Sequence, residues 1–521
     1  MTVDVAYQGR DAKFQQGAVR FLKCTPVLLT AIVALVTAPS CVGEDCTDAN
    51  ACSTSNAKPE GSDGGTPSTA IPDGCDLSVA PDKAPACIAD EIAIFVSPTG
   101  ADGNDGTKAR PVRTIGAALS KLQGKPRIYV CDGTYREPIT VTIPVGLHGG
   151  FSCADWTPNG VHPKVEGTTD KPALVVSGAS GVVVTDLDFE TPPADARGAS
   201  SIAGLIVTSS VTLQRTLFKA GAGQPGIDAP SKGTFQPATA PKGGDGDPNG
   251  VALAPAVANP LCPTSVGGAS GKVPNGPFAT GGKPFISPAV PATNTGAPGT
   301  NQSGEPGHDG SHGNGGAAGS GATSLGLLGK NGWLPEAGQS GGAGSPGQGG
   351  GGGASPDLDF YPGGGGPGGC GGAGGAGGGG GGASVALAVL DSPLVIEQSF
   401  FMAGSAGRGG TGGQGQIAQR GGPTGDCLEE LKGGTGGAGG SGGGGGGGAG
   451  GISVGILWKG RTPLIDGRST PGTATLDGIS VGAPGDAGKG GASGPTATTG
   501  SVSGATGLDG RSGVAQAILG L

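Results

Sequence analysis

Three acidic side chains alternate with apolar residues in the segment TDLDFE, and they are the residues best suited to chemistry. Asp186, Asp188 and Glu190 are two positions apart, so a strand would carry all three on one outward face. Carboxylates arranged in this way can bind Ca²⁺ or act on a glycosidic bond. A solvated strand face without chemistry is the competing interpretation.

Two turns rich in Asp and Gly offer oxygen ligands for Ca²⁺. The first contains Asp102, Asn104 and Asp105, and the second contains Asp245 and Asp247. Neither matches an EF-hand loop or a glycine-rich calcium-binding repeat. Asp, Asn and Gly are also the residues that tight turns need. We therefore expect turns, with Ca²⁺ as the alternative, and no other cofactor.

The histidines do not make a catalytic set. The chain has 4 of them, at positions 148, 162, 308 and 312, and three lie beside Gly or Pro in loops, where a base is held poorly. The sequence contains no recognisable Ser/His/Asp triad, and we interpret His148 as a structural residue. Matches to the GxGxxG pattern are expected by chance at this glycine content, and the P-loop pattern is absent.

The composition narrows the class of protein. Of 521 residues, 117 are Gly, and the formal net charge is −9. An acidic chain without a basic stripe is unsuited to binding nucleic acid. A uniform collagen helix is excluded, because the glycines cluster and do not recur at every third position along the chain. The core must come from aliphatic residues, since aromatic residues are 4%.

Short apolar segments predict strands, and some of them repeat. We expect strands at 92–97, 127–131 and 139–143, and a helix at 114–122. Residues 202–221 and 385–404 align without a gap at an offset of 183, a weaker copy spans 452–482, and an earlier unit lacking a glycine tract spans 173–190. Each unit is too short to bury its own apolar face, so the units must stack. A β-sandwich is the alternative architecture.

The segments VSPTGADGNDGTKARPVRTIGAAL and IYVCDGTYREPITV resemble the entry of right-handed parallel β-helix domains of the pectin-lyase-like class. The segment GLHGGFSCADW resembles one found in glycine-rich, PGRS-like lipoproteins of myxobacteria. The resemblance implies an all-β solenoid with a short N-terminal capping helix. Lyases of the class remove a proton with a basic group, and Arg215 on the next coil is the candidate here.

The N-terminus has the features of an export signal. Residues 26–38 form an apolar run that is too short to span a bilayer, and Arg20 and Lys23 precede it. The following Ala-Pro-Ser-Cys resembles a bacterial lipobox, which implies a lipid on Cys41 and sorting to the outer membrane or cell surface. The long leader suggests Val19 rather than Met1 as the translation start.

Cysteine usage suits an oxidising compartment. No Cys or His spacing resembles a zinc site, and disulfides are expected in an exported chain. Proximity in the sequence suggests four pairs and leaves Cys262 unpaired. The suggested pairs are Cys46–Cys52, Cys75–Cys87, Cys131–Cys153 and Cys370–Cys427.

The expected organisation follows from these patterns. Glycine tracts interrupt the stack at equivalent places, so they should leave from one edge. We expect them to be disordered loops, with packed, extended glycine-rich helices as the alternative. The expected parts are a signal (1–40), a polar tether (41–91), N-terminal coils (92–220), glycine-rich segments (221–383, 405–451, 483–513), later rungs (384–404, 452–482) and a last strand (514–521).

The sequence favours a structural or adhesive role at the cell surface over a catalytic one. We expect a non-catalytic lipoprotein that displays glycine-rich loops on a β-helix, with a structural or adhesive function. Its partners would be the membrane, through the lipid, and an extracellular glycan or surface protein. The alternative is a polysaccharide lyase or glycoside hydrolase that uses Asp186, Asp188, Glu190 and Arg215.

Overall fold

A computed structural model describes residues 71–247, 252–272, 279–283, 305–355, 361–427, 431–469 and 478–521. The predicted signal, the lipid site Cys41 and the predicted Cys46–Cys52 pair lie outside these residues. In this part of the chain, no helix is long and apolar enough to cross a bilayer.

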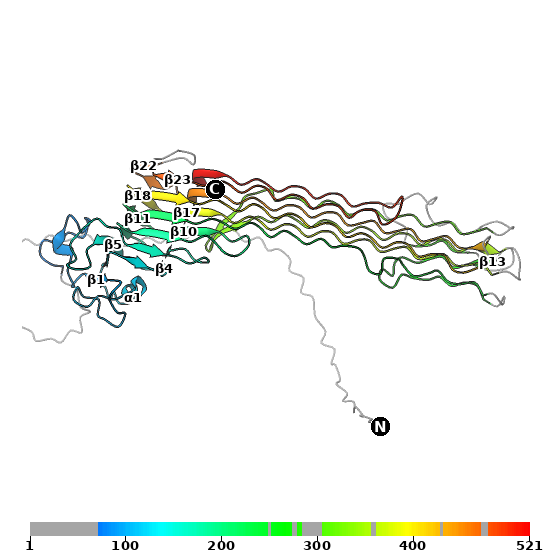
Figure 1. Cartoon of the computed structure of the whole chain (residues 1–521), viewed down its shortest axis with the longest axis horizontal. Helices are drawn as coiled ribbons and strands as arrows, with labels where there is room; N and C mark the ends of the chain where they lie inside the picture. Colours follow the sequence, from blue (N-terminus) through cyan, green and yellow to red (C-terminus); the bar gives the residue numbers. More distant parts are fainter. Residues whose placement is uncertain are drawn as a thin grey trace, which may run out of the picture. The chain divides into compact units, whose positions relative to one another are not determined.

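The described strands form three large sheets that make up the sides of a parallel β-helix (Figure 1). Sheet 1 contains β1 (Ala93–Val96), β2 (Arg127–Cys131), β5 (Gly146–Phe151), β8 (Val182–Thr185), β11 (Val211–Gln214), β18 (Leu394–Glu397), β21 (Leu464–Ile465) and β22 (Arg468–Ser469). Sheet 2 contains β4 (Ile139–Val141), β7 (Leu174–Ser177), β10 (Ser201–Val207), β17 (Ser384–Leu390), β20 (Ser453–Lys459) and β24 (Ala515–Gly520). Sheet 3 contains β3 (Thr134–Tyr135), β6 (Lys164–Glu166), β9 (Asp188–Thr191), β12 (Leu217–Ala220), β19 (Phe400–Ala403) and β23 (Ile479–Ser480).

Each complete coil takes one strand from each sheet, and successive coils pair in parallel. The repeat predicted at an offset of 183 residues is confirmed, because Ile202 pairs with Val385 and Phe218 pairs with Phe401. The parallel β-helix predicted from the sequence is therefore correct. Each glycine tract leaves after a strand of sheet 3 and returns before a strand of sheet 2, so the tracts do leave from one edge.

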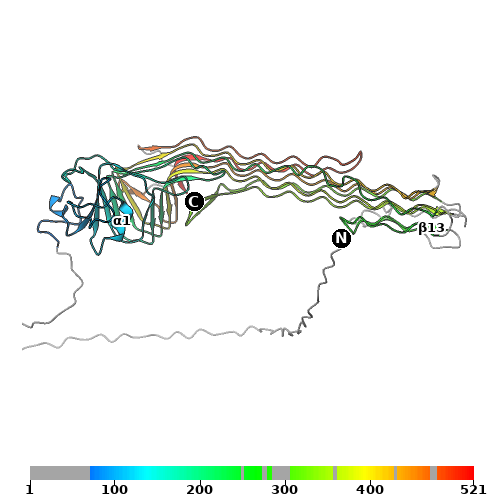
Figure 2. The same ribbon diagram turned by 60° about the horizontal axis from the view of Figure 1, so that its bottom comes forward.

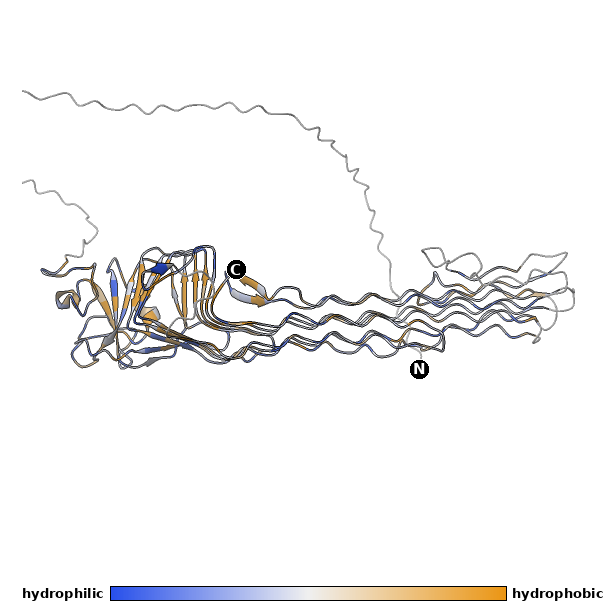
Figure 3. Cartoon of the chain, turned by 90° about the horizontal axis from the view of Figure 1, so that it is seen from above, coloured by the Kyte–Doolittle hydropathy of each residue, from blue (hydrophilic) through white to orange (hydrophobic). Residues whose placement is uncertain are grey.

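Side chains stacked coil upon coil fill the interior. Phe189, Phe218 and Phe401 occupy equivalent places on three coils, with ring centroids 4.9 and 5.7 Å apart along the stack. All three side chains are buried. Stacked aliphatic and aromatic rows of this kind supply the burial that one coil alone cannot achieve. Figure 3 shows the apolar residues concentrated in these strands.

The first coil is capped by a helix and by the segment before it. Helix α1 (Ile115–Ser120) confirms the predicted helix, and the Glu137 carboxylate accepts hydrogen bonds from the backbone N–H groups of Ile115 and Gly116. Residues 71–91 were expected to belong to a tether. Instead, they include a one-turn 3₁₀ helix (Pro85–Cys87) and pack Cys87 against Ile92, because a disulfide and apolar contacts fix them.

The glycine tracts form a bundle of extended segments beyond the β-helix (Figures 1 and 2). Backbone hydrogen bonds join neighbouring segments at every third residue, as from Gly369 to Gly437 and from Gly372 to Gly440. A three-residue step is that of a polyproline II helix, which rises about 3.1 Å per residue. Residues 433–451, named here the inner segment, therefore span about 60 Å.

The inner segment has bonded neighbours on six sides. Its N–H groups donate to residues 336–351, 407–422 and 502–511, and its carbonyls accept from residues 310–322, 366–381 and 485–494. A Cβ on Gly443 would overlap the carbonyl oxygen of Ala317. Glycine predominates here because adjacent backbones occupy the space that side chains would need.

The expectation of disordered loops is therefore wrong for the described parts of the tracts, and the packed alternative is correct. A local signal existed in the sequence. Non-glycine residues recur every third position at Pro367, Cys370, Ala373 and Ala376, which matches the helical repeat. Within this segment the non-glycine residues have a three-residue period, but the high density of glycine around them makes that period hard to recognise.

A hairpin from the longest tract folds back on the outside of sheet 2. Strands β14 (Gly326–Gly329) and β15 (Gly332–Pro335) pair antiparallel. Trp333 from this hairpin is buried among residues such as Val385 and Leu457, so the β-helix has a second apolar core outside its coils. Near the far end of the bundle, β13 (Gly271–Lys272) pairs in parallel with β16 (Ala354–Ser355).

Two of the predicted cysteine pairs, Cys75–Cys87 and Cys131–Cys153, are disulfides in the structure. The predicted pairing of Cys370 with Cys427 is wrong, as is the assignment of Cys262 as unpaired, because Cys262 and Cys370 form the third disulfide. Proximity in sequence failed here because Cys262 and Cys370, 108 residues apart, belong to segments that the bundle brings together.

Candidate functional site

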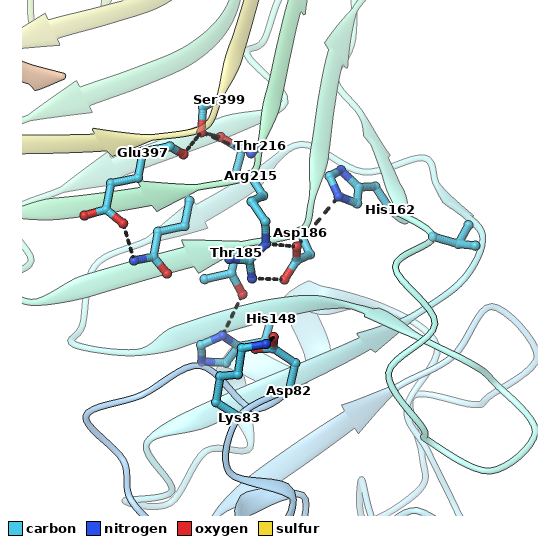
Figure 4. A network of polar contacts seen from close by, with 12 residues as sticks. Asp82, Lys83, His148, His162, Thr185, Asp186, Arg215, Thr216, Glu397 and Ser399 are labelled. Atoms are coloured by element: carbon cyan, nitrogen blue, oxygen red, sulfur yellow. Dashed lines mark hydrogen bonds and ion pairs between the residues drawn. The ribbon is translucent and has the colours of Figure 1, made fainter. Parts of the chain in front are cut away.

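A polar cluster occupies the corner between sheets 1 and 3 (Figure 4). Asp186 and Arg215 lie in consecutive coils, directly after β8 and β11, with left-handed backbone φ angles of 55° and 51°. Arg215 donates two hydrogen bonds to the Asp186 carboxylate, at 2.6 and 2.7 Å. This ion pair raises the pKa of Arg215, so its guanidinium stays protonated and cannot act as a base.

His162 joins the cluster from the loop before β6. Its Nδ1 lies 2.9 Å from Asp188 Oδ1, and its Nε2 lies 3.7 Å from Asp186 Oδ1. The hydrogen bond with Asp188 is the main cause that raises the pKa of His162, and partial burial opposes it. The sequence predicts His162 to be a weakly held loop histidine, since nothing local indicates that Asp186, in a turn, and Asp188, in β9, would lie beside it.

The three predicted acids do not share one row. Asp188 and Glu190 point outward from β9 on either side of the buried Phe189, as expected. Asp186 lies in the turn before the strand and faces Arg215. Glu190 instead lies near Lys164 and Lys219, at 3.8 and 3.5 Å. The acids therefore belong to two separate ion-pair groups.

A groove of about 700 Å³ runs along sheet 3 beside the cluster. His162, Asp188 and Arg215 line one part of it. Phe400, Met402 and Ile479 line another part, and the Phe400 side chain is 57% exposed. A groove with an apolar platform and nearby polar groups has the general character of a small-molecule site.

The predicted Ca²⁺ ligands hold the backbone in place, those near residue 102 within one loop and Asp245 between two segments of the bundle. Asp102 accepts from the backbone N–H groups of Arg113 and Thr114, and Asn104 donates to the Pro111 carbonyl. Asp105 accepts from Thr107, while Asp245 accepts from the Asp426 N–H. Within the described residues, no three His, Cys, Asp or Glu side chains, including Asp247, gather as metal ligands.

The remaining histidines have structural surroundings. His148 is buried in β5, and its Nδ1 lies 2.8 Å from Thr185 Oγ1. Burial lowers the pKa of His148 to about 3, so its ring is neutral. His312 Nδ1 accepts a hydrogen bond from the Ala438 N–H of the inner segment. His308 contributes its backbone carbonyl, which accepts from Gly351.

Comparisons with known proteins support the fold. Residues 98–216 match a family model described as a protein of unknown function (DUF1565), a family associated with parallel β-helix folds. The uncharacterized protein YwoF of Bacillus subtilis is 30% identical over 108 residues. That match covers 19% of this chain and 18% of YwoF. No solved structure matches the chain. The chain is thus a parallel β-helix protein. The comparisons do not indicate its function, which we infer from the geometry of the site.

Proposed function

We propose that this chain is a non-catalytic surface protein in which a β-helix carries a stiff glycine-rich rod, with a structural or adhesive role. The observation that carries the proposal is the six-sided hydrogen bonding of the inner segment. A bundle bonded at every third residue resists bending, whereas a single polyproline II chain has no internal hydrogen bonds. Such a rod can hold its far end at a fixed distance from the β-helix.

An exported, lipid-anchored location is part of the proposal. The three disulfides are compatible with an oxidising compartment outside the cytoplasm. The PGRS-like lipoprotein resemblance and the cysteine after the apolar leader favour a lipid on Cys41. Intact-mass analysis of protein extracted from membranes tests this: we expect a diacylglyceryl group on Cys41 and release of the Cys41→Ala variant from the membrane fraction. An unmodified wild-type cysteine would contradict the anchor.

The adhesive role is tested with labelled, full-length mature protein on whole cells and on a glycan array. We expect saturable binding that a Gly443→Ala variant loses, if the rod presents the binding end. Gly103→Ala is the matched control, because a Cβ there meets nothing within 4 Å. Absence of saturable binding to any cell or glycan would contradict an adhesive role and leave a structural one.

A polysaccharide-active enzyme is the second candidate, and the groove beside His162 and Asp188 favours it. The Arg215 base proposed for a lyase is disfavoured by its ion pair with Asp186. A panel of acidic and neutral glycans, assayed for unsaturated uronate and for new reducing ends, separates the two candidates. Turnover that Asp188→Asn abolishes would replace the non-catalytic proposal.

A further inference from the structure

A second hollow, distinct from the groove on sheet 3, lies on the outward face of sheet 1. Its volume is about 640 Å³, within the range of small-molecule sites. Residues 77–80 form one wall, and outward side chains of sheet 1 and its corner form the other. The polar lining side chains are those of Ser78, Arg127, His148, Thr185, Thr212, Gln214 and Arg215.

The wall formed by residues 77–80 is held in place. The Cys75–Cys87 disulfide closes the segment that contains it. Arg127 Nη2 donates to the carbonyls of Leu77 and Val79, at 2.9 and 2.8 Å, and the Tyr129 hydroxyl donates to the Cys87 carbonyl at 2.6 Å. The hollow is therefore a preformed feature and needs no loop closure.

Its charge is unusual for so acidic a chain. The lining includes two guanidinium groups and no carboxylate. Arg215 is balanced by Asp186, but Arg127 forms no ion pair with any described residue. Arg127 is only 4% exposed, its hydrogen-bond partners are neutral oxygens, and Asp76 acts on it only through a longer-range electrostatic interaction. Burying a cation without a directly bonded carboxylate is costly. An anion in the hollow would relieve that cost.

Donor groups are available to such an anion. A guanidinium has five N–H groups, and the bonds to Leu77, Val79 and Tyr129 occupy three of those on Arg127. The His148 ring is neutral because burial lowers its pKa. When Thr185 donates its hydroxyl proton to Nδ1, the ring proton lies on Nε2. That nitrogen lies over Gly146, where a Cβ would collide with it.

We propose that this hollow binds a small organic oxyanion, a carboxylate or a sulfate ester on a molecule the size of a monosaccharide. Arg127 is the charge partner, and Thr212 supplies a further polar contact from β11, where the Gln214 amide is already bonded to Glu397. The hollow shares Arg215 with the groove of the enzyme candidate but none of that groove's other lining residues, and it lies apart from the glycine bundle. A failure of this proposal would therefore leave the proposed function unaffected, and the reverse also holds.

The test is calorimetric titration of the full mature chain with glucuronate, glucose 6-sulfate and glucose. We expect binding of a charged probe, weakened by added salt, and at least a tenfold lower affinity for glucose. The charged probe that binds more tightly identifies the anion as carboxylate or sulfate. Equal binding of glucose, or no binding of either charged probe, would overturn the proposal.

Two matched variants assign the site. Thr212→Glu adds a carboxylate to the lining, and we expect it to reduce binding at least tenfold. Val395→Glu is the control, because Val395 pairs with Thr212 one coil further on and lies outside the lining. Arg127→Met should also lose binding, with a count of free thiols to verify that the Cys75–Cys87 disulfide persists. Equal effects of the two glutamates would overturn the assignment.

Discussion

Asp186 and Arg215 join two successive coils through a two-pronged ion pair at one corner of the β-helix. Because the two hydrogen bonds need the planar guanidinium fork, lysine cannot replace arginine here. We expect Arg215→Lys to lower the free energy of unfolding by about 1–2 kcal/mol. Urea denaturation measures this. Arg461→Lys, at an exposed position, is the control, and an equal effect of both changes would refute the role of the fork.

His162 should stabilise the fold more strongly in mild acid. The hydrogen bond with Asp188 raises its pKa above the ordinary value of about 6.5. The stabilisation is therefore complete below the unfolded-state pKa and is lost as the pH rises through the folded-state value. We expect the stability difference between wild type and His162→Gln to be larger at pH 5.5 than at pH 9. An imidazole that titrates below 6.5 in an NMR titration would contradict this.

His148 should have the opposite effect. Burial keeps its ring neutral, with a pKa of about 3, against about 6.5 in the unfolded chain. Its contribution to stability is present above pH 6.5 and is lost as the pH falls toward 3. Replacing it by glutamine should flatten the loss of stability between pH 6.5 and 4, measured by denaturant unfolding. An unchanged pH profile would show that the ring titrates elsewhere.

The inner segment should not tolerate a single methyl group. We expect Gly443→Ala to cost about 1–3 kcal/mol, since the Cβ would overlap the Ala317 carbonyl oxygen and the neighbours are backbone. Hydrogen exchange of residues 433–451 reports the effect as faster exchange in the variant. Gly103→Ala should leave exchange unchanged. Wild-type amides that exchange as fast as those of a free peptide would contradict the bundle itself.

Peptide mapping without reduction tests the third disulfide. We expect a cross-linked peptide that contains Cys262 and Cys370. Because this bond closes a loop of more than 100 residues, its removal in Cys262→Ser should cost about 4–5 kcal/mol in the chain-entropy model. A cross-link between Cys370 and Cys427 would contradict the structure and restore the pairing suggested by sequence proximity.

The β-helix was predictable from sequence because its signal is carried by side chains. The gapless match of residues 202–221 with 385–404 contains the register that pairs Ile202 with Val385. Local patterns also located α1 and the acidic residues of β9. In each of these cases, the residues that identify the element also form its contacts.

The bundle and the corner cluster were not predictable in the same way. Glycine has no side chain, so the tracts gave no amphipathic pattern, and their backbone partners lie in distant segments. His162 meets Asp188 only after β6 and β9 stack. The pairing of Cys262 with Cys370 likewise depends on segments that meet only within the folded bundle.

The inner segment needs partners from further along the chain before its hydrogen bonding is complete. Ser441, Gly444, Gly447 and Gly450 donate to acceptors at 502–511, close to the C-terminal strand. A chain without residues 502–511 would leave one side of the inner segment open to water. The inner segment therefore completes its hydrogen bonding only when residues 502–511 are in place, and a truncation after residue 500 would remove the partners on that side of the bundle.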